Sequence, residues 1–193
     1  YKRALQLAPQ APIAIKLHSV MLAAGSAKDA EQFSRTWLSS NPDDTTFTAY
    51  LGETAIAAKD FPLAEKQLQT VLQRQPENVV ALNNLAWVEL QLKRPDNALK
   101  LAEQATTLAP NQPPFMDTLA AVLSAKGEHA KAVELQSKVV ALRPDDSTFR
   151  LNLAKIYIAA GDKTKAKVEL DSLAKLGDKF NGQAEVSALL KTL

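Results

Sequence analysis

Cysteine is absent from the 193-residue sequence, and aromatic residues make up only 6% of it. The lack of cysteine excludes disulfide bonds, thiolate metal sites and a cysteine nucleophile. It leaves the cellular compartment open, because both reducing and oxidising environments contain cysteine-free proteins. Hydrophobic residues nevertheless account for 46% of the chain. Alanine and leucine must therefore supply most of the core that other proteins build with aromatic rings.

Long hydrophobic runs and an excess of one charge sign are also missing. No apolar run approaches the roughly 18–20 residues that a transmembrane helix needs. The 23 basic and 21 acidic residues give a net charge of +2. A balance this close to zero predicts no broad attraction to nucleic acid or to an anionic membrane surface. The composition indicates an ordinary soluble protein whose partners are proteins or peptides.

What the sequence does contain is a repeat with a period of 34 residues. The proline column consists of Pro42, Pro76, Pro110 and Pro144, with Pro9 standing 33 residues before the first of them. The leucine column consists of Leu51, Leu85, Leu119 and Leu153, with Leu17 in phase. The alanine column consists of Ala30, Ala64, Ala98, Ala132 and Ala166, and the turn column of Gly25, Lys59, Lys93, Gly127 and Gly161. Chance does not align so many positions, so the whole chain is predicted to be repetitive.

Each period is predicted to contain two helices. Residues 79–92 carry apolar side chains at helical spacing, and so do residues 97–108. Pro95 suits the first turn of the second helix, where a backbone N–H is not needed. Pro110 then ends that helix. No segment shows the two-residue period and β-branched enrichment of a strand, so the sequence predicts an all-α fold.

Small residues indicate how the two helices of a period pair. A small residue follows most members of the leucine column, and the alanine column faces it from the second helix. Helices that pack closely need small residues at both positions. His18 interrupts this pattern in the first period. That helical pair is therefore predicted either to be splayed or to have its register shifted by one residue.

The leucine-small pair, the alanine and the proline at this interval resemble the tetratricopeptide repeat (TPR). The resemblance covers essentially the whole chain and implies a right-handed superhelix, or α-solenoid, of stacked helix-turn-helix hairpins. We expect one array over residues 1–193, with repeats at 11–44, 45–78, 79–112, 113–146 and 147–180. Residues 1–10 resemble the end of a truncated repeat, and residues 183–193 resemble a C-terminal capping helix. We accordingly expect a cut N-terminus and a natural C-terminus.

The first helices of TPR hairpins line a concave face that binds peptides or partner proteins. Transferring those columns implies a partner-binding groove made of Tyr50, Glu53, Asn83, Asn84, Trp87, Asp117, Thr118, Asn152 and Lys155. An asparagine amide both donates and accepts hydrogen bonds, so it can clamp a peptide backbone without reading side chains. A tryptophan in such a column can anchor a partner. Two alternatives stay open: the asparagines bond between adjacent repeats, and Trp87 packs against the neighbouring hairpin.

Other notable side chains are interpreted as structural. Trp37 and the phenylalanines at 47, 115 and 149 fall in packing columns, so they are predicted to be core residues. The aspartate pairs at 43–44 and 145–146 follow the proline column. Their position predicts N-caps of the next helices rather than a cation site.

The groups needed for catalysis are not found at motif spacings. His18 and His129 are the only histidines, and neither has a serine or an acid at a motif spacing. The sequence has no glycine-rich phosphate loop and no histidine pair for zinc. We therefore predict no enzyme activity, no cofactor and no metal. Glu53 and Asp117 in the groove columns would repel a terminal carboxylate, so that class of peptide ligand is not expected.

A narrower resemblance covers residues 79–193. The stretch Ala-Leu-Asn-Asn-Leu-Ala-Trp at 81–87 and the stretch Met-Asp-Thr-Leu-Ala at 116–120 resemble the last repeats of bacterial PEP-CTERM system TPR-repeat lipoproteins. This resemblance implies an exported, lipid-anchored scaffold that works with exopolysaccharide production and protein sorting. The location would then be periplasmic or at the outer membrane, with the anchor upstream of Tyr1, and otherwise cytoplasmic.

Three functions therefore follow from the sequence. The leading hypothesis is a non-catalytic protein–protein interaction scaffold. A second is a self-associating structural module, because truncation at Tyr1 would uncover an apolar helical face. A third is a regulatory arm of a larger enzyme whose catalytic domain lies upstream.

Overall fold

The computed structural model describes residues 1–193, except for the side chains of Lys2 and Gln6. Every regular element within that description is a helix, and none of the described residues lies in a β-strand. The all-α prediction is therefore confirmed. Contacts divide the chain into two compact units, Tyr1–Ala81 and Leu82–Leu193.

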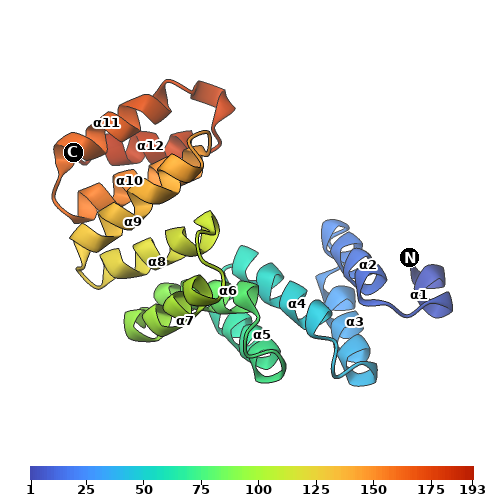
Figure 1. Ribbon diagram of the computed structural model, residues 1–193. Coiled ribbons are helices and arrows are strands. Elements are labelled where there is room, and N and C mark those ends of the chain that lie inside the picture. Colours follow the sequence, from blue (N-terminus) through green and yellow to red (C-terminus); the bar gives the residue numbers. More distant parts are fainter. The chain divides into compact units, whose positions relative to one another are not determined.

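The helices follow one another with short connections throughout (Figure 1). The N-terminal helices are α1 (Lys2–Leu7), α2 (Ala11–Ala23), α3 (Ala27–Ser40), α4 (Thr45–Ala57) and α5 (Phe61–Arg74). The next are α6 (Val79–Gln91), α7 (Pro95–Leu108), α8 (Pro113–Ala125) and α9 (His129–Leu142). The last are α10 (Ser147–Ala159), α11 (Lys163–Ala174) and α12 (Gln183–Leu190), with the 3-10 turn η1 (Gly177–Lys179) before α12. As predicted, Pro95 begins a helix, and α7 ends two residues before Pro110.

Tight turns join these helices into hairpins. Within the units, α2 packs against α3, α4 against α5, α8 against α9, and α10 against α11. One residue of each hairpin turn has a left-handed backbone, with φ of 81° at Gly127 and 78° at Gly161. The corresponding lysines adopt the same conformation, with φ of 59° at Lys59 and 62° at Lys93. Glycine accepts this conformation without steric cost and lysine does not, so two of the turns are strained.

Aspartates begin several of the helices. The Asp44 side chain accepts a hydrogen bond from the backbone N–H of Phe47 at 2.9 Å. The Asp146 side chain accepts one from the N–H of Thr148 at 3.0 Å. Both contacts satisfy an N–H that a helix start leaves without a partner. The predicted N-capping role is therefore confirmed for one aspartate of each pair.

Small side chains occupy the interior of the hairpins. Every member of the alanine column is at most 1% exposed, and Ala86, Ala120 and Ala154 are fully buried opposite it. At Gly52, an added Cβ atom would lie only 3.1 Å from the Cγ atom of Leu68. These positions leave no room for larger residues, as their spacing in the sequence predicted.

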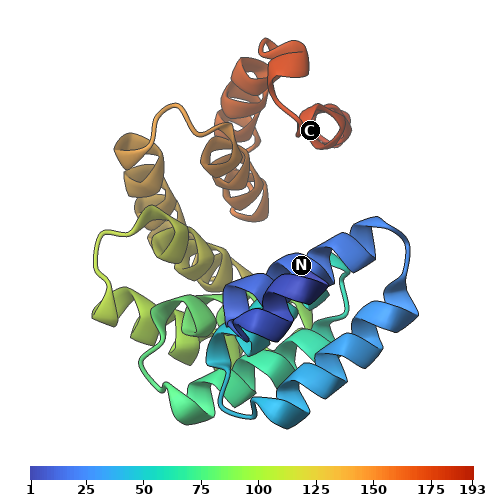
Figure 2. The ribbon, with the colours of Figure 1, turned by 90° about the vertical axis from the view of Figure 1, so that its right-hand side faces the viewer.

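The core of the Tyr1–Ala81 unit is aromatic despite the low aromatic content of the chain. It lies among α2, α3 and α4, and Figure 2 shows the backbones of these helices from a second side. Phe47 is fully buried, and its ring centroid lies 6.1 Å from that of Trp37 and 5.8 Å from that of Tyr50. The Trp37 Nε1 atom donates a hydrogen bond to Asp44 Oδ2 at 2.8 Å, so its one polar atom is satisfied. The predicted core positions of Trp37 and Phe47 are confirmed.

The core of the Leu82–Leu193 unit is mainly aliphatic. At its C-terminal end, Val186 of α12 is fully buried in a cluster with Leu170 and Leu173 of α11. This helix stops at Leu190, earlier than the sequence suggested. The reason is local, because the backbone N–H and the Oγ1 hydroxyl of Thr192 both donate to the Leu189 carbonyl and close a turn. Leu193 still packs against the same cluster.

Candidate functional site

The residues predicted to form a groove lie on four helices, each the first of its hairpin. Tyr50 and Glu53 are on α4 in the Tyr1–Ala81 unit. The others are in the Leu82–Leu193 unit: Asn83, Asn84 and Trp87 on α6, Asp117 and Thr118 on α8, and Asn152 and Lys155 on α10. Three of the four helices therefore share one compact unit.

A hollow of about 290 Å³ lies between α6, α8 and α10, and we call it the α6–α8–α10 groove. Five of the predicted residues line it, namely Trp87, Asp117, Thr118, Asn152 and Lys155. Leu90, Ala121 and Ile156 add apolar walls, and Gln91 and Ser124 complete it. The groove thus combines an aromatic ring, aliphatic surface and a few polar groups, which is the usual composition of a binding site.

A hydrogen-bonded network surrounds Asp117 in this groove. The Asn152 Nδ2 atom donates to both carboxylate oxygens of Asp117, at 2.9 Å to Oδ1 and 3.0 Å to Oδ2. The Gln136 Nε2 atom donates to Asp117 Oδ1 at 2.6 Å and to the Phe149 carbonyl at 2.9 Å. Side chains from α8, α9 and α10 therefore meet at a single carboxylate.

The charge of Asp117 is balanced by dipoles and not by a cation. Its carboxylate forms no ion pair with any side chain that the structure describes. Burial raises the pKa of the Asp117 carboxyl above its ordinary value, and the nearby charge of Asp146 adds to the rise. The hydrogen bonds from Asn152 and Gln136 oppose it, and so does the charge of Lys155. Burial has the largest effect, because a carboxylate loses hydration when it enters the protein.

Lys155, the basic residue of the groove, already has a partner. Its Nζ atom lies 2.6 Å from Glu185 Oε1 of α12. Both side chains are partly exposed, so the pair is one of modest strength. The pair nonetheless cancels most of the positive charge at that end of the groove.

The remaining predicted residues do not line the groove. Asn83 and Asn84 are half-buried on α6, and the Oδ1 atom of Asn83 is buried with no hydrogen-bond partner among the described residues. Glu53 is exposed on α4. Tyr50 is half-buried, and its hydroxyl lies 2.9 Å from His18 Nδ1. A binding role for these four residues stays a prediction.

Gln136 is part of the site although the sequence did not single it out. It is fully buried in the middle of α9. The 34-residue period places it in a column with Ser34, Leu68, Ala102 and Leu170, all of which are buried. A glutamine in a buried column requires polar partners inside the protein, and this requirement could have identified it from the sequence.

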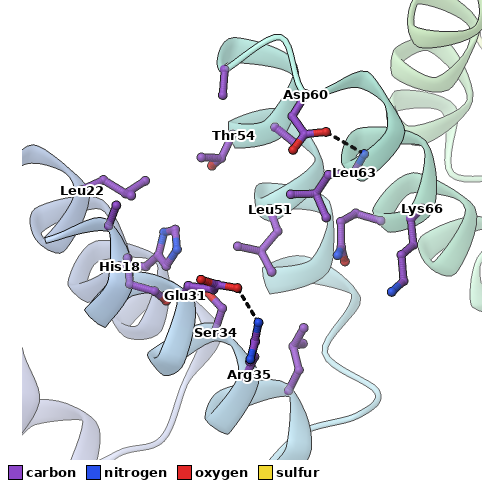
Figure 3. Close-up of a pocket in the computed structure, with 16 residues that line it drawn as sticks. His18, Leu22, Glu31, Ser34, Arg35, Leu51, Thr54, Asp60, Leu63 and Lys66 are labelled. Atoms are coloured by element: carbon purple, nitrogen blue, oxygen red, sulfur yellow. Dashed lines mark hydrogen bonds and ion pairs between the residues drawn. The ribbon is translucent and has the colours of Figure 1, made fainter. Parts of the chain in front are cut away.

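A second hollow, of about 460 Å³, lies among α2, α3, α4 and α5 of the Tyr1–Ala81 unit (Figure 3). Several of its polar side chains already have partners. Ser34 Oγ donates to the Ala30 carbonyl at 2.9 Å, Glu31 pairs with Arg35 at 2.5 Å, and His18 contacts Tyr50. The rest of the lining is largely aliphatic and includes Leu51. This hollow therefore offers mainly apolar surface.

The repeat columns do not predict this second hollow. Ser34 shares its column with Leu68, Ala102, Gln136 and Leu170, and Glu31 shares its column with Glu65, Leu99, Val133 and Lys167. Both columns change in size and polarity from one period to the next.

The described residues contain no group of histidine, aspartate and glutamate side chains that could hold a metal ion. Among the helices that the structure describes, none is both long and apolar enough to cross a membrane. The residues that line the α6–α8–α10 groove offer hydrogen bonding, charge and apolar contact.

Comparisons with known proteins place the fold. Two family profiles described as tetratricopeptide repeat match residues 49–113 and residues 123–193, which together make up more than half of the chain. No curated protein sequence matches the chain significantly. The fold indicates partners that are proteins or peptides.

Solved structures agree with this assignment. TTC0263, a thermophilic TPR protein of Thermus thermophilus, is 19% identical, with a TM-score of 0.75 over 94% of this chain and 99% of that one. PilF of Pseudomonas aeruginosa is 22% identical, with a TM-score of 0.73 over 97% of this chain and 86% of that one. YrrB, described as a TPR protein with an unusual peptide-binding site, is 18% identical, with a TM-score of 0.69 over 100% and 97%. At these identities the likeness shows the fold alone.

Proposed function

Because the chain belongs to the tetratricopeptide repeat family, we propose that it is a non-catalytic scaffold that binds an extended peptide or a segment of a partner protein. The binding site is the α6–α8–α10 groove. The observation that carries the proposal is the meeting of Trp87, Asp117 and Asn152 on three first helices around one hollow. We also propose that the chain forms a single array of five repeats, as expected from the sequence. The other predicted residues that would contribute to binding are Tyr50, Glu53, Asn83 and Asn84.

The groove offers what an extended peptide needs. The Nδ2 atom of Asn152 is engaged by Asp117, which fixes the orientation of the amide. Its carbonyl oxygen can then accept a hydrogen bond from a peptide N–H. The Trp87 ring and the apolar walls at Leu90 and Ile156 can cover a side chain of the peptide. YrrB, which has the same fold, is described as having a peptide-binding site, and this supports the proposal.

Binding to a random peptide library displayed on phage tests the groove. We expect the protein to enrich peptides, and the double variant Trp87→Ala/Asn152→Ala, which removes two side chains that line the groove, to lose their binding. A matched double variant, Lys100→Ala/Leu108→Ala, removes two exposed side chains of α7 outside the groove and should bind like the wild type. Equal binding by all three proteins would refute the groove assignment. Circular dichroism checks that each variant is folded.

We also propose that the scaffold acts in a bacterial envelope assembly associated with exopolysaccharide. The support is the resemblance of residues 79–193 to PEP-CTERM system TPR-repeat lipoproteins. Fractionation of cells that express the parent gene tests this proposal. Recovery in the membrane fraction with a lipid-modified cysteine upstream of Tyr1 is expected, and recovery in the cytoplasm alone would overturn it.

Self-association is a second candidate, favoured by the apolar surface of α1. Leu7 is 80% exposed and Tyr1 is 61% exposed, which is unusual for two large side chains so close in sequence. Light scattering over a concentration series should show dimers that Leu7→Ser removes. A monomer at every concentration would end this alternative.

A further inference from the structure

Asp117 is a largely buried carboxylate that has hydrogen-bond donors but no cationic partner among the described residues. A carboxylate held away from water is costly unless a cation or several hydrogen-bond donors compensate it. Here the compensation comes from two neutral amides, those of Asn152 and Gln136. No basic side chain among the described residues forms an ion pair with it.

The charges near Asp117 do not supply that cation. Asp146 acts on Asp117 as a second negative charge. Lys155 is the nearby positive charge, but Glu185 pairs with it at 2.6 Å. Asp117 and Lys155 are the charged residues that line the groove, and Asp146 and Glu185 lie outside its lining. Because Glu185 neutralises Lys155 and Asp146 adds a negative charge, the surroundings of Asp117 favour a cation.

The walls of the groove suit a long side chain with a positive end. Leu90, Ala121 and Ile156 provide aliphatic surface along which methylene groups can lie. Trp87 lines the same hollow, and the face of an indole ring attracts cations. Thr118 is uncharged, and its Oγ1 hydroxyl donates to the Pro114 carbonyl at 3.2 Å.

We propose that the α6–α8–α10 groove selects a basic side chain, a lysine or an arginine, of the bound peptide, and that the Asp117 carboxylate is its partner. This inference rests on the proposed peptide-binding function and names the chemistry that the peptide must carry. The cation lies between the Asp117 oxygens and the Trp87 ring, and its stem lies on the aliphatic wall. Asn152 and Gln136 position the carboxylate and do not contact the cation.

The proposal gives a reason why a largely buried carboxylate is held by two neutral amides and by no basic side chain. Neutral amides hold Asp117 in place. Its Oδ1 atom already accepts from both Gln136 and Asn152, whereas Oδ2 accepts only from Asn152 and keeps further capacity to accept a hydrogen bond. A lysine or arginine of the protein at this point would have satisfied the carboxylate and closed the site. Its absence among the described neighbours keeps the carboxylate available to a ligand.

The test compares matched peptides on matched variants. The peptides enriched from the phage-displayed random library are synthesised with their basic residue, with citrulline in place of arginine, and with norleucine in place of lysine. Fluorescence anisotropy measures their affinity for the wild type, for Asp117→Asn and for Asp178→Asn. The last variant removes one acidic charge from an exposed turn outside the groove.

We expect a basic residue at one fixed position of the enriched peptides, and a loss of about tenfold in wild-type affinity when its charge is removed. Asp117→Asn should lower the affinity for the basic peptide to that of the neutral one and leave the neutral peptide unaffected. Asp178→Asn should behave like the wild type. The separate behaviour of the two peptides distinguishes a lost ion pair from a damaged fold.

Three other outcomes refute the inference. Peptides that bind without a preferred basic position, or a charge effect that persists in Asp117→Asn, would overturn the selection of a cation while the proposed function stands. Failure of the wild type to enrich any peptide would overturn both. A preference between arginine and lysine then tells whether the planar stacking of a guanidinium on Trp87 contributes.

Discussion

The Nδ1 atom of His18 on α2 lies 2.9 Å from the hydroxyl oxygen of Tyr50 on α4, and the two rings meet edge to face at 5.4 Å. His18 occupies the position that a small residue fills in the later repeats, yet it is only 5% exposed. Its ring is accommodated against the following hairpin, where it also contacts Phe47. His18 is therefore accommodated in the aromatic core by its polar contact with Tyr50.

The stability of the protein should fall on mild acidification because of His18. Burial lowers the pKa of its imidazole below the ordinary value. The unfolded chain therefore takes up a proton at a higher pH than the native protein does, and lowering the pH favours unfolding. The free energy of unfolding should decrease from about pH 7 to about pH 5 in the wild type but not in His18→Gln. Chemical denaturation at a series of pH values measures it.

Tyr50→Phe is the control for this prediction. It removes the hydroxyl that faces His18 but leaves the imidazole buried, and burial is the cause of the lowered pKa. This variant should be less stable at every pH and should keep the pH dependence of the wild type. A wild type and a His18→Gln variant with parallel pH profiles would contradict the interpretation.

Asp117 should give the opposite dependence. Its raised pKa means that the native protein binds the proton more tightly than the unfolded chain does. The stability associated with this group is present at low pH and is lost as the pH rises through the native pKa. The free energy of unfolding of Asp117→Asn, relative to the wild type, should therefore increase as the pH rises above about 4, the ordinary pKa of an aspartate. Urea denaturation of both proteins at a series of pH values measures this difference, and a difference that stays constant with pH would contradict the interpretation.

A larger residue in the alanine column should destabilise the hairpins. Ala98 and Ala132 are fully buried between paired helices. Leucine at either position adds atoms for which there is no space, at a cost of about 1–3 kcal/mol. Thermal denaturation would show a lower Tm for Ala98→Leu and Ala132→Leu. Ala141→Leu, on the exposed side of α9, should leave the Tm nearly unchanged.

Glycine should stabilise the two strained turns. Lys93 has a φ of 62° in the turn before α7, where Gly127 and Gly161 hold the equivalent positions later in the chain. Lys93→Gly and Lys59→Gly should each raise the free energy of unfolding by roughly 0.5–1 kcal/mol. Lys100→Gly, in the interior of α7, should instead lower it by about 1 kcal/mol. Urea denaturation of the three variants decides the point, and a loss of stability at all three positions would contradict it.

The sequence predicted the elements and their small-residue interfaces because those depend on local rules. Proline at the start of α7, alanine inside the hairpins and a left-handed turn residue can all be identified from a single period. The network at Asp117 could not be predicted in the same way. It depends on a carboxylate, an amide 19 residues later and another 35 residues later reaching one point. Only the three-dimensional structure gives that convergence.

The second hollow, among α2, α3, α4 and α5, could not be predicted from the sequence either. A column is identified by what its members share, so Ser34 and Glu31 pass as ordinary helix residues. Residues of α2, α3, α4 and α5 line the hollow, so it arises only when these helices are placed together. The early end of α12 is local, because the backbone N–H of Thr192 donates to the Leu189 carbonyl three residues back and closes a turn tighter than an α-helical one.

The described bonds between side chains rarely reach further than one period along the chain. Gln75 and Thr45 are 30 residues apart, Lys126 and Asp96 are 30 apart, and Asn152 and Asp117 are 35 apart. A protein built this way has low contact order, so folding can begin at any hairpin and spread to its neighbours. In evolution, a whole period could be duplicated or deleted without breaking side-chain bonds between distant repeats. The length of the binding surface could then change while its chemistry stayed the same.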